Sequence, residues 1–158
     1  MQRLNLIRNQ LASHTFSKLS IEVVDGNIGI VTLNAPKELN ALSQTMQSDI
    51  AAAFRLFDSD PKIKVIVLRS AVEKAFCAGA NIKEFTSATG ETQNLNDLFQ
   101  TIDEAFLKCK KPIIALVNGF ALGGGFEIVL ASDIIIMAQD AKVGLPELTL
   151  GLIPGIGG

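Results

Sequence analysis

Two glutamates in the C-terminal third of this 158-residue chain could do acid–base chemistry. Glu127 and Glu147 lie in a tract, residues 112–158, that has only three other charged side chains. Glu127 stands among apolar residues just after three glycines, and Glu147 follows a proline. Two carboxyls in different surroundings suit a reaction in which one group takes a proton and the other gives one. Alone, Glu147 would be read as an ordinary turn or helix-start residue, so the hypothesis rests on the pair.

Small residues in two segments could place backbone N–H groups beside these carboxyls. Residues 76–85 include Cys-Ala-Gly-Ala, and residues 118–127 include three consecutive glycines. Glycine lets the backbone approach a ligand closely, and two N–H groups aimed at one point form an oxyanion hole. The second segment has neither G-x-G-x-x-G nor a Walker lysine, which argues against a nucleotide-phosphate loop. By itself, the first segment could also be a close-packed loop, and the second could be a tight joint between a strand and a helix.

The remaining composition excludes several other chemistries. His14 is the only histidine and precedes the predicted core, so a Ser-His-Asp or Cys-His mechanism has no base. Cys77 and Cys109 are too few for a zinc site or a disulfide framework. A net charge of −2 offers no basic surface for nucleic acid or for a membrane, and no apolar stretch is long enough to span one. We therefore expect no metal, no redox cofactor, no nucleic acid and no membrane as partners.

The elements that must position these residues alternate between strands and helices. Apolar alternation predicts a hairpin of strands over 20–25 and 28–33, joined by Asp-Gly-Asn. Helical spacing predicts helices over 42–57, 95–106 and 126–131, and apolar runs predict strands over 63–68, 112–117, 134–138 and 141–145. This order indicates an α/β layered domain. Mean hydropathy of +0.35 with 19% charged residues predicts that the chain is deeply buried or covered by a partner.

The two ends of the chain carry separate signals. Residues 1–19 contain Arg3, Arg8 and Lys18, no acid and several hydroxyls, which is typical of a mitochondrial presequence. The alternative is a frayed leader without an address, in a cytoplasmic protein. Residues 20–158 form the predicted domain, and its last eight residues are an apolar loop. We expect this domain to be the N-terminal core of a longer one.

Four segments, taken together and in this order, resemble the crotonase superfamily, also called the enoyl-CoA hydratase/isomerase family. They are Asn-Ala-Pro-Lys-Glu-Leu-Asn-Ala-Leu at 34–42, the small-residue segment at 75–84, the glycine-rich segment at 111–127, and Gly-Leu-Pro-Glu with the loop after it at 144–158. The resemblance runs from about Leu19 to Gly158. It implies a crotonase-like spiral of ββα units that is incomplete at the C-terminus.

The resemblance implies an enzyme that acts on acyl-CoA thioesters, with coenzyme A as part of the substrate and not a cofactor. By position, the N–H groups of Ala80 and Gly124 would form the oxyanion hole. Glutamates at both catalytic positions favour an enoyl-CoA hydratase, a lyase of fatty-acid or amino-acid breakdown. It would add water across the Cα=Cβ bond of a trans-2-enoyl-CoA. Glu147 would protonate Cα, and Glu127 would help to activate the water.

Substrate contacts and assembly also follow from the resemblance. The residues that would contact the substrate or its CoA are Ala78, Ala80, Asn81, Ile82, Lys83 and Gly124. Asn81 stands where many family members have Asp. The full-length protein would be a homo-oligomer, a trimer or a dimer of trimers. The alternatives are a truncated, non-catalytic fragment that binds CoA or joins subunits, and an enoyl-CoA isomerase.

Overall fold

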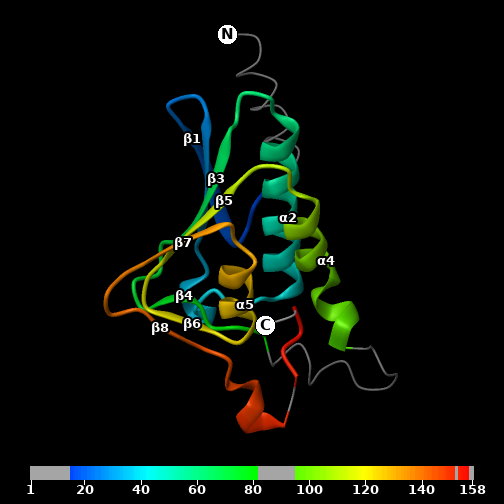
Figure 1. The fold of residues 1–158 in the computed structure, drawn as a ribbon, viewed down its shortest axis with the longest axis vertical. Helices are drawn as coiled ribbons and strands as arrows, with labels where there is room; N and C mark the ends of the chain where they lie inside the picture. Colours follow the sequence, from blue (N-terminus) through cyan, green and yellow to red (C-terminus); the bar gives the residue numbers. More distant parts are fainter. Residues whose placement is uncertain (1–14, 82–94, 152, 157–158) are drawn as a thin grey trace.

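The computed structural model describes residues 15–81, 95–151 and 153–156. Strands, α-helices and short 3-10 helices (η) alternate along the chain (Figure 1). Their order is β1 (Leu19–Val24), β2 (Ile28–Leu33), η1 (Pro36–Glu38), α2 (Gln44–Ser59), β3 (Val65–Ser70), β4 (Ala75–Cys77), α4 (Leu95–Lys108), β5 (Ile113–Val117), β6 (Phe120–Leu122), α5 (Gly124–Leu130), β7 (Ile134–Met137), β8 (Lys142–Gly144) and η2 (Pro146–Leu150).

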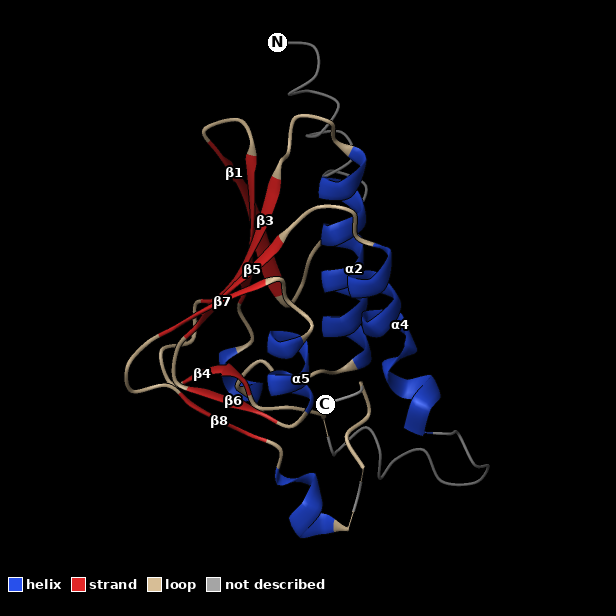
Figure 2. Cartoon of the chain, viewed as in Figure 1, coloured by secondary structure: helices blue, strands red, loops and turns tan. Residues whose placement is uncertain are grey.

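Two sheets organise the described residues. The larger sheet has the order β1-β2-β3-β5-β7, and the smaller has the order β4-β6-β8. Among the strands that the structure describes, β1 and β2 pair antiparallel as a hairpin, and the other strand pairs are parallel. Helices α2 and α4 lie together on one side of the large sheet, and α5 lies between the two sheets (Figure 2). The predicted α/β layered domain is therefore confirmed.

Helix α2 forms where the sequence predicts it. Ser43 is the N-cap, and its Oγ accepts a hydrogen bond from the N–H of Met46 at 3.1 Å. The apolar stripe of the helix turns inward, and Phe54 packs edge to face on Phe106 of α4 with ring centroids 5.0 Å apart. The predicted hairpin, the helix α4 and the strands β5, β7 and β8 are also present, with ends shifted by a few residues.

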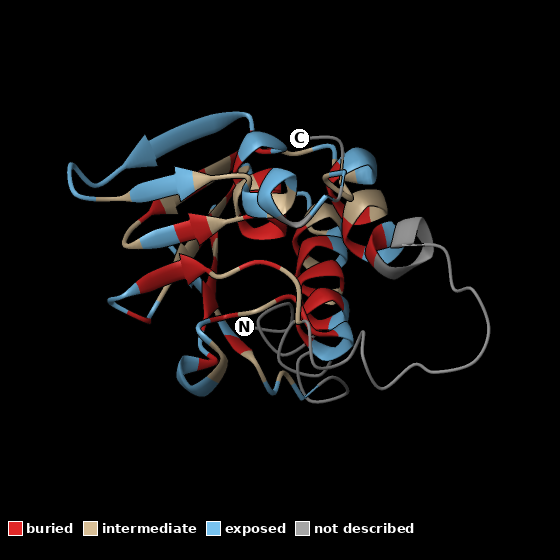
Figure 3. Ribbon diagram, turned by 90° about the horizontal axis from the view of Figure 1, so that it is seen from below, coloured by how far each residue is buried: buried red, intermediate tan, exposed pale blue. Residues whose placement is uncertain are grey.

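Burial is uneven between the inner strands of the large sheet and its β7 edge (Figure 3). Val31 of β2 and both Ile66 and Leu68 of β3 are fully buried. All four residues of β7 are exposed, with Ile136 at 56%. Within the described residues, no helix is long and apolar enough to cross a membrane.

Two strands and one helix boundary differ from the sequence prediction. The sequence analysis assigns no strand to the residues of the three-residue strands β4 and β6. They pair with each other, with Cys77 opposite Ala121. Strands this short are not stable by themselves, so the pairing is what stabilises them. Helix α5 begins at Gly124 and not at Phe126. The missing side chain at Gly125 makes this possible, because a Cβ there would collide with the carbonyl oxygen of Cys77 on β4.

Candidate active site

The N-terminal end of α5 is the centre of the candidate site. Strand β6 ends at Leu122, and the backbone turns into α5 through Gly123, which has φ 53° and ψ −131°. The N–H of Gly123 donates to the carbonyl oxygen of Gly144 on β8 at 2.9 Å, which fixes the turn. Gly124 is the first residue of the helix, so its N–H has no partner inside the helix.

The structure brings the backbone of Ala80 to this helix end, as the sequence predicts. A Cβ built on Gly124 would lie 3.9 Å from the nitrogen of Ala80. A Cβ built on Gly79, which has φ +96°, would lie 3.6 Å from the nitrogen of Gly124 and 2.7 Å from the carbonyl oxygen of Leu122. Only glycine at position 79 therefore leaves room for the two N–H groups to approach each other.

Glu127 lies in the first turn of the same helix and is only 3% exposed. Its Oε2 accepts the N–H of Gly155 at 3.2 Å, and its Oε1 accepts the N–H of Ile156 at 2.7 Å. The sequence did not predict that the C-terminal loop donates hydrogen bonds to this carboxylate, because the donors are backbone N–H groups and every residue type except proline has one.

Glu147 approaches the other side of the turn. Glu147 belongs to the first turn of η2, and its Oε1 lies 2.5 Å from the position that a Cβ on Gly123 would take. Its Oε2 is buried and makes no hydrogen bond to any described residue. A buried polar atom without a partner is costly in a protein interior, and at a binding site a ligand can supply the partner.

The sequence analysis also missed Phe99 of α4. This ring is 6% exposed and contacts two parts of the site. A Cβ on Gly124 would lie 3.7 Å from its Cε1, and a Cβ on Gly155 would lie 2.6 Å from its Cδ2. Phe99 therefore packs between the helix end and the loop that binds Glu127. Its sequence signal is that of an ordinary apolar helix position.

The predicted CoA-contact residues are placed only in part. Ala78 and Asn81 are half-buried and flank Ala80, and the N–H of Ala78 donates to the carbonyl oxygen of Leu39 at 3.0 Å. Ile82 and Lys83 lie outside the described residues. Their predicted contacts remain predictions.

Cys77 precedes this segment and is no nucleophile. Burial raises the pKa of its thiol to about 12, and a hydrogen bond with the backbone of Gly79 opposes this shift only in part. A thiol with so high a pKa stays protonated at neutral pH, whereas a nucleophilic cysteine needs the thiolate. Its Sγ instead donates to the carbonyl oxygen of Asn40 at 3.0 Å.

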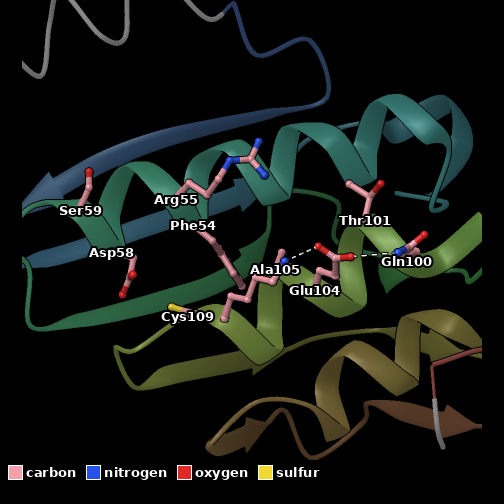
Figure 4. A pocket seen from close by; sticks show the side chains of 10 residues that line it. Phe54, Arg55, Asp58, Ser59, Gln100, Thr101, Glu104, Ala105 and Cys109 are labelled. Atoms are coloured by element: carbon pink, nitrogen blue, oxygen red, sulfur yellow. Dashed lines mark hydrogen bonds and ion pairs between the residues drawn. The ribbon is translucent and has the colours of Figure 1, made fainter.

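A groove of about 550 Å³ lies between α2 and α4 and is separate from the candidate site (Figure 4). It is lined mainly by polar side chains, among them Arg55, Asp58, Gln100 and Glu104. None of the predicted site residues lines it. Among the residues that the structure describes, no group of three or more His, Cys, Asp or Glu side chains could hold a metal ion.

The fold and the pair of glutamates beside two close N–H groups belong to a known class. The sequence pattern of the enoyl-CoA hydratase/isomerase family matches residues 24–158 of this chain. The chain therefore belongs to the enoyl-CoA hydratase/isomerase family.

Individual relatives agree with this assignment. The chain is 48% identical over 133 residues to a probable mitochondrial enoyl-CoA hydratase of Dictyostelium discoideum, covering 84% of this chain and 47% of that protein. It is 34% identical over 164 residues to the mitochondrial 3-hydroxyisobutyryl-CoA hydrolase of Bos taurus, covering 99% and 42%. A crystal structure of an enoyl-CoA hydratase from Bacillus anthracis matches with a TM-score of 0.80 and 33% identity, over 89% of this chain and 55% of that one.

These matches confirm the expected crotonase-type fold. The chain spans about half the length of the curated relatives that it matches.

Proposed function

We propose that the full-length protein containing these residues is an enoyl-CoA hydratase-type lyase that adds water across the Cα=Cβ bond of a trans-2-enoyl-CoA. The observation that carries the proposal is the arrangement around the start of α5. There, Glu127 and Glu147 flank a turn at which the backbone of Gly124 lies next to the backbone of Ala80. Relatives named enoyl-CoA hydratase, at up to 48% identity, support it.

In this mechanism the thioester oxygen accepts hydrogen bonds from the N–H groups of Ala80 and Gly124. These donors stabilise the enolate charge as it develops, and losing one such donor typically slows a reaction by about 10² to 10³-fold. The oxygen of the water bonds to Cβ while Glu127 takes one of its protons. Glu147 delivers a proton to Cα. The buried Oε2 of Glu147, which has no hydrogen-bond partner among the described residues, suits its role as a proton donor.

The wider setting is also a proposal. Coenzyme A enters as part of the substrate, so the reaction uses no separate cofactor. The full-length protein acts as a homo-oligomer in mitochondria, in the breakdown of fatty acids or amino acids. The mitochondrial relatives from Dictyostelium discoideum and Bos taurus support the location.

The test is the hydration of crotonyl-CoA by the full-length protein and by its Glu127→Gln and Glu147→Gln variants. Each variant should lower kcat by about 10² to 10⁴-fold, because each removes a proton-transfer group and keeps the shape of the side chain. Glu104→Gln is the matched control, since Glu104 lies on the exposed face of α4, and it should leave kcat unchanged. Unchanged hydration in both site variants would reject the proposal.

Product analysis separates the other reactions of related proteins. Hydration gives a 3-hydroxyacyl-CoA, isomerisation moves the double bond, and thioester hydrolysis releases free CoA. Because one relative is named a hydrolase, the release of free CoA should be measured alongside hydration. Release of CoA as the main product, with no 3-hydroxyacyl-CoA, would replace the proposed reaction with hydrolysis.

A further inference from the structure

Asn40 is a fully buried polar residue in the turn that connects η1 to α2. Its Oδ1 accepts the N–H of Ala35 at 2.7 Å. Its Nδ2 donates to the hydroxyl of Ser70 at 2.8 Å and to the carbonyl oxygen of Phe76 at 3.0 Å. One side chain therefore joins the turn, the end of β3 and strand β4.

The same turn binds the whole segment that leads to Ala80. The Cys77 thiol donates to the carbonyl oxygen of Asn40 at 3.0 Å, and the N–H of Ala78 donates to the carbonyl oxygen of Leu39 at 3.0 Å. The N–H of Leu42 donates to the carbonyl oxygen of Gly79 at 2.7 Å. Together with the Phe76 carbonyl, each of the four residues before Ala80 is hydrogen-bonded to residues 39–42.

The turn that makes these hydrogen bonds has an unfavourable backbone conformation. Leu39 and Asn40 are consecutive left-handed residues, with φ of 49° and 57°. A leucine pays a steric cost in this region, whereas asparagine tolerates it better than most residues. Such strain persists only where the surrounding contacts over-determine it, and it gathers at functional sites.

Ser70 completes the network. Its hydroxyl accepts the Asn40 Nδ2–H, accepts the N–H of Val72 at 2.9 Å, and lies 2.7 Å from the carbonyl oxygen of Ala75, to which it donates. A buried network whose members are all bonded is rigid, and it specifies one arrangement of the chain.

We propose that Asn40 is a positioning residue for the reaction, and that with Ser70 it fixes the direction in which the Ala80 N–H points. A backbone N–H cannot be aimed by its own side chain, so its direction depends on how the preceding residues are held. Errors of about 1 Å in a reacting geometry can cost about 10²-fold in rate. The inference rests on the function proposed above.

Asn40→Asp is the first test, in the full-length protein. Aspartate keeps the size, the Oδ1 acceptor and the tolerance of a left-handed backbone, but places an oxygen against the Phe76 carbonyl. We expect kcat for crotonyl-CoA to fall by about 10²-fold and KM to rise by a smaller factor of about three to ten, because an oxyanion contact already forms with the bound thioester and is strongest in the transition state. Ser70→Ala removes one arm of the network and should lower kcat by about tenfold.

Asp49→Ala is the matched control for a merely structural loss. Asp49 is another buried polar side chain, and its Oδ2 accepts the N–H groups of Ser17 and Lys18, far from Ala80 in the chain. It should lower thermal stability while kcat stays within about twofold of the parent protein, because these two hydrogen bonds hold residues 17 and 18 and not the segment 76–80. A tenfold loss of kcat in Asp49→Ala would mean that any buried polar deletion produces the effect, and would overturn the proposal.

A binding measurement separates positioning from general damage. The probes are hexanoyl-CoA and its thioether S-hexyl-CoA, which lacks the carbonyl oxygen. Asn40→Asp and Ser70→Ala should weaken binding of the thioester and leave the thioether within about twofold, because only the thioester uses the oxyanion hole. Equal weakening of both probes, or of neither, would overturn the role of Asn40. A parent protein that hydrates no enoyl-CoA would instead overturn the proposed function, and this inference with it.

Discussion

Strands β3 and β7 belong to the same parallel sheet and have similar sequences, Val-Ile-Val-Leu in β3 and Ile-Ile-Ile-Met in β7, yet they meet different surroundings. β3 lies between β2 and β5, and its Ile66 is fully buried. β7 lies at the edge of the sheet formed by the described residues, where it pairs with β5, and its Ile136 is 56% exposed. An apolar run thus predicts a strand, whereas burial depends on which segments pack on it.

The largest difference in stability should come from replacing an isoleucine with alanine on each of the two strands. Ile66→Ala should lower the free energy of unfolding by about 4 kcal/mol, because it leaves a cavity in a closed core. Ile136→Ala should cost less than about 1 kcal/mol, because solvent already reaches the side chain. Urea denaturation of both variants measures the difference. Equal losses would mean that β7 is covered in solution.

A pair of glycines should give the next largest effect. Gly125→Ala would drive a Cβ into the carbonyl oxygen of Cys77, and it should cost about 3 kcal/mol through overpacking. Gly144 on β8 has only a side-chain carbon of Leu122 at 4.0 Å from such a Cβ, so Gly144→Ala should cost less than about 1 kcal/mol. Thermal unfolding followed by circular dichroism compares the two. A harmless Gly125→Ala would contradict the close packing of α5 on β4.

The exposed edge should also show in self-association. An open apolar edge strand is a template for pairing, and one charged residue on it usually blocks this. We expect Ile136→Lys to lower the concentration-dependent association of the 158-residue chain, as measured by light scattering. Leu107→Lys is the control, because Leu107 is a 76% exposed apolar residue on α4. A similar decrease in both variants would assign the effect to net charge and not to the edge.

The smallest effect belongs to the opposite edge of the sheet. Glu22 of β1 forms an ion pair with Arg69 of β3 at 2.7 Å, and both side chains are exposed. Glu22→Gln should cost at most about 0.5 kcal/mol, since exposed pairs are screened by solvent. Urea denaturation at low and high salt checks this. A loss above that of Gly125→Ala would show that the N-terminal edge depends on charge.

These contrasts explain which parts of the fold the sequence predicts. Helix α2 is long and periodic enough for its own residues to define it, and strand β5 is an unbroken run of apolar residues. Ala75–Cys77 and Phe120–Leu122 are three residues each, and both become strands only because the chain brings them together. No local pattern contains that information.

The candidate site divides in the same way. The carboxyls of Glu127 and Glu147 and the small residues around Ala80 and Gly124 have types and spacings that a sequence displays. The contacts that hold these residues in place cannot be recognised in the sequence. They come from backbone groups, such as the Gly155 N–H, or from an ordinary apolar residue, such as Phe99. Asn40 reads as a turn former, and its bonds to residues 70 and 76 appear only after folding.

The hydrogen bonds from Asp49 have a consequence for proteolytic processing. They hold the backbone of Ser17 and Lys18, and Leu19 then enters β1 opposite Leu33. Proteases cleave readily where the backbone is free to leave the fold, and poorly where it is bonded. A protease that trims the folded chain from its N-terminus should therefore stop before Ser17. Mass spectrometry of the trimmed product would locate the cut, and Asp49→Ala should move it toward the sheet.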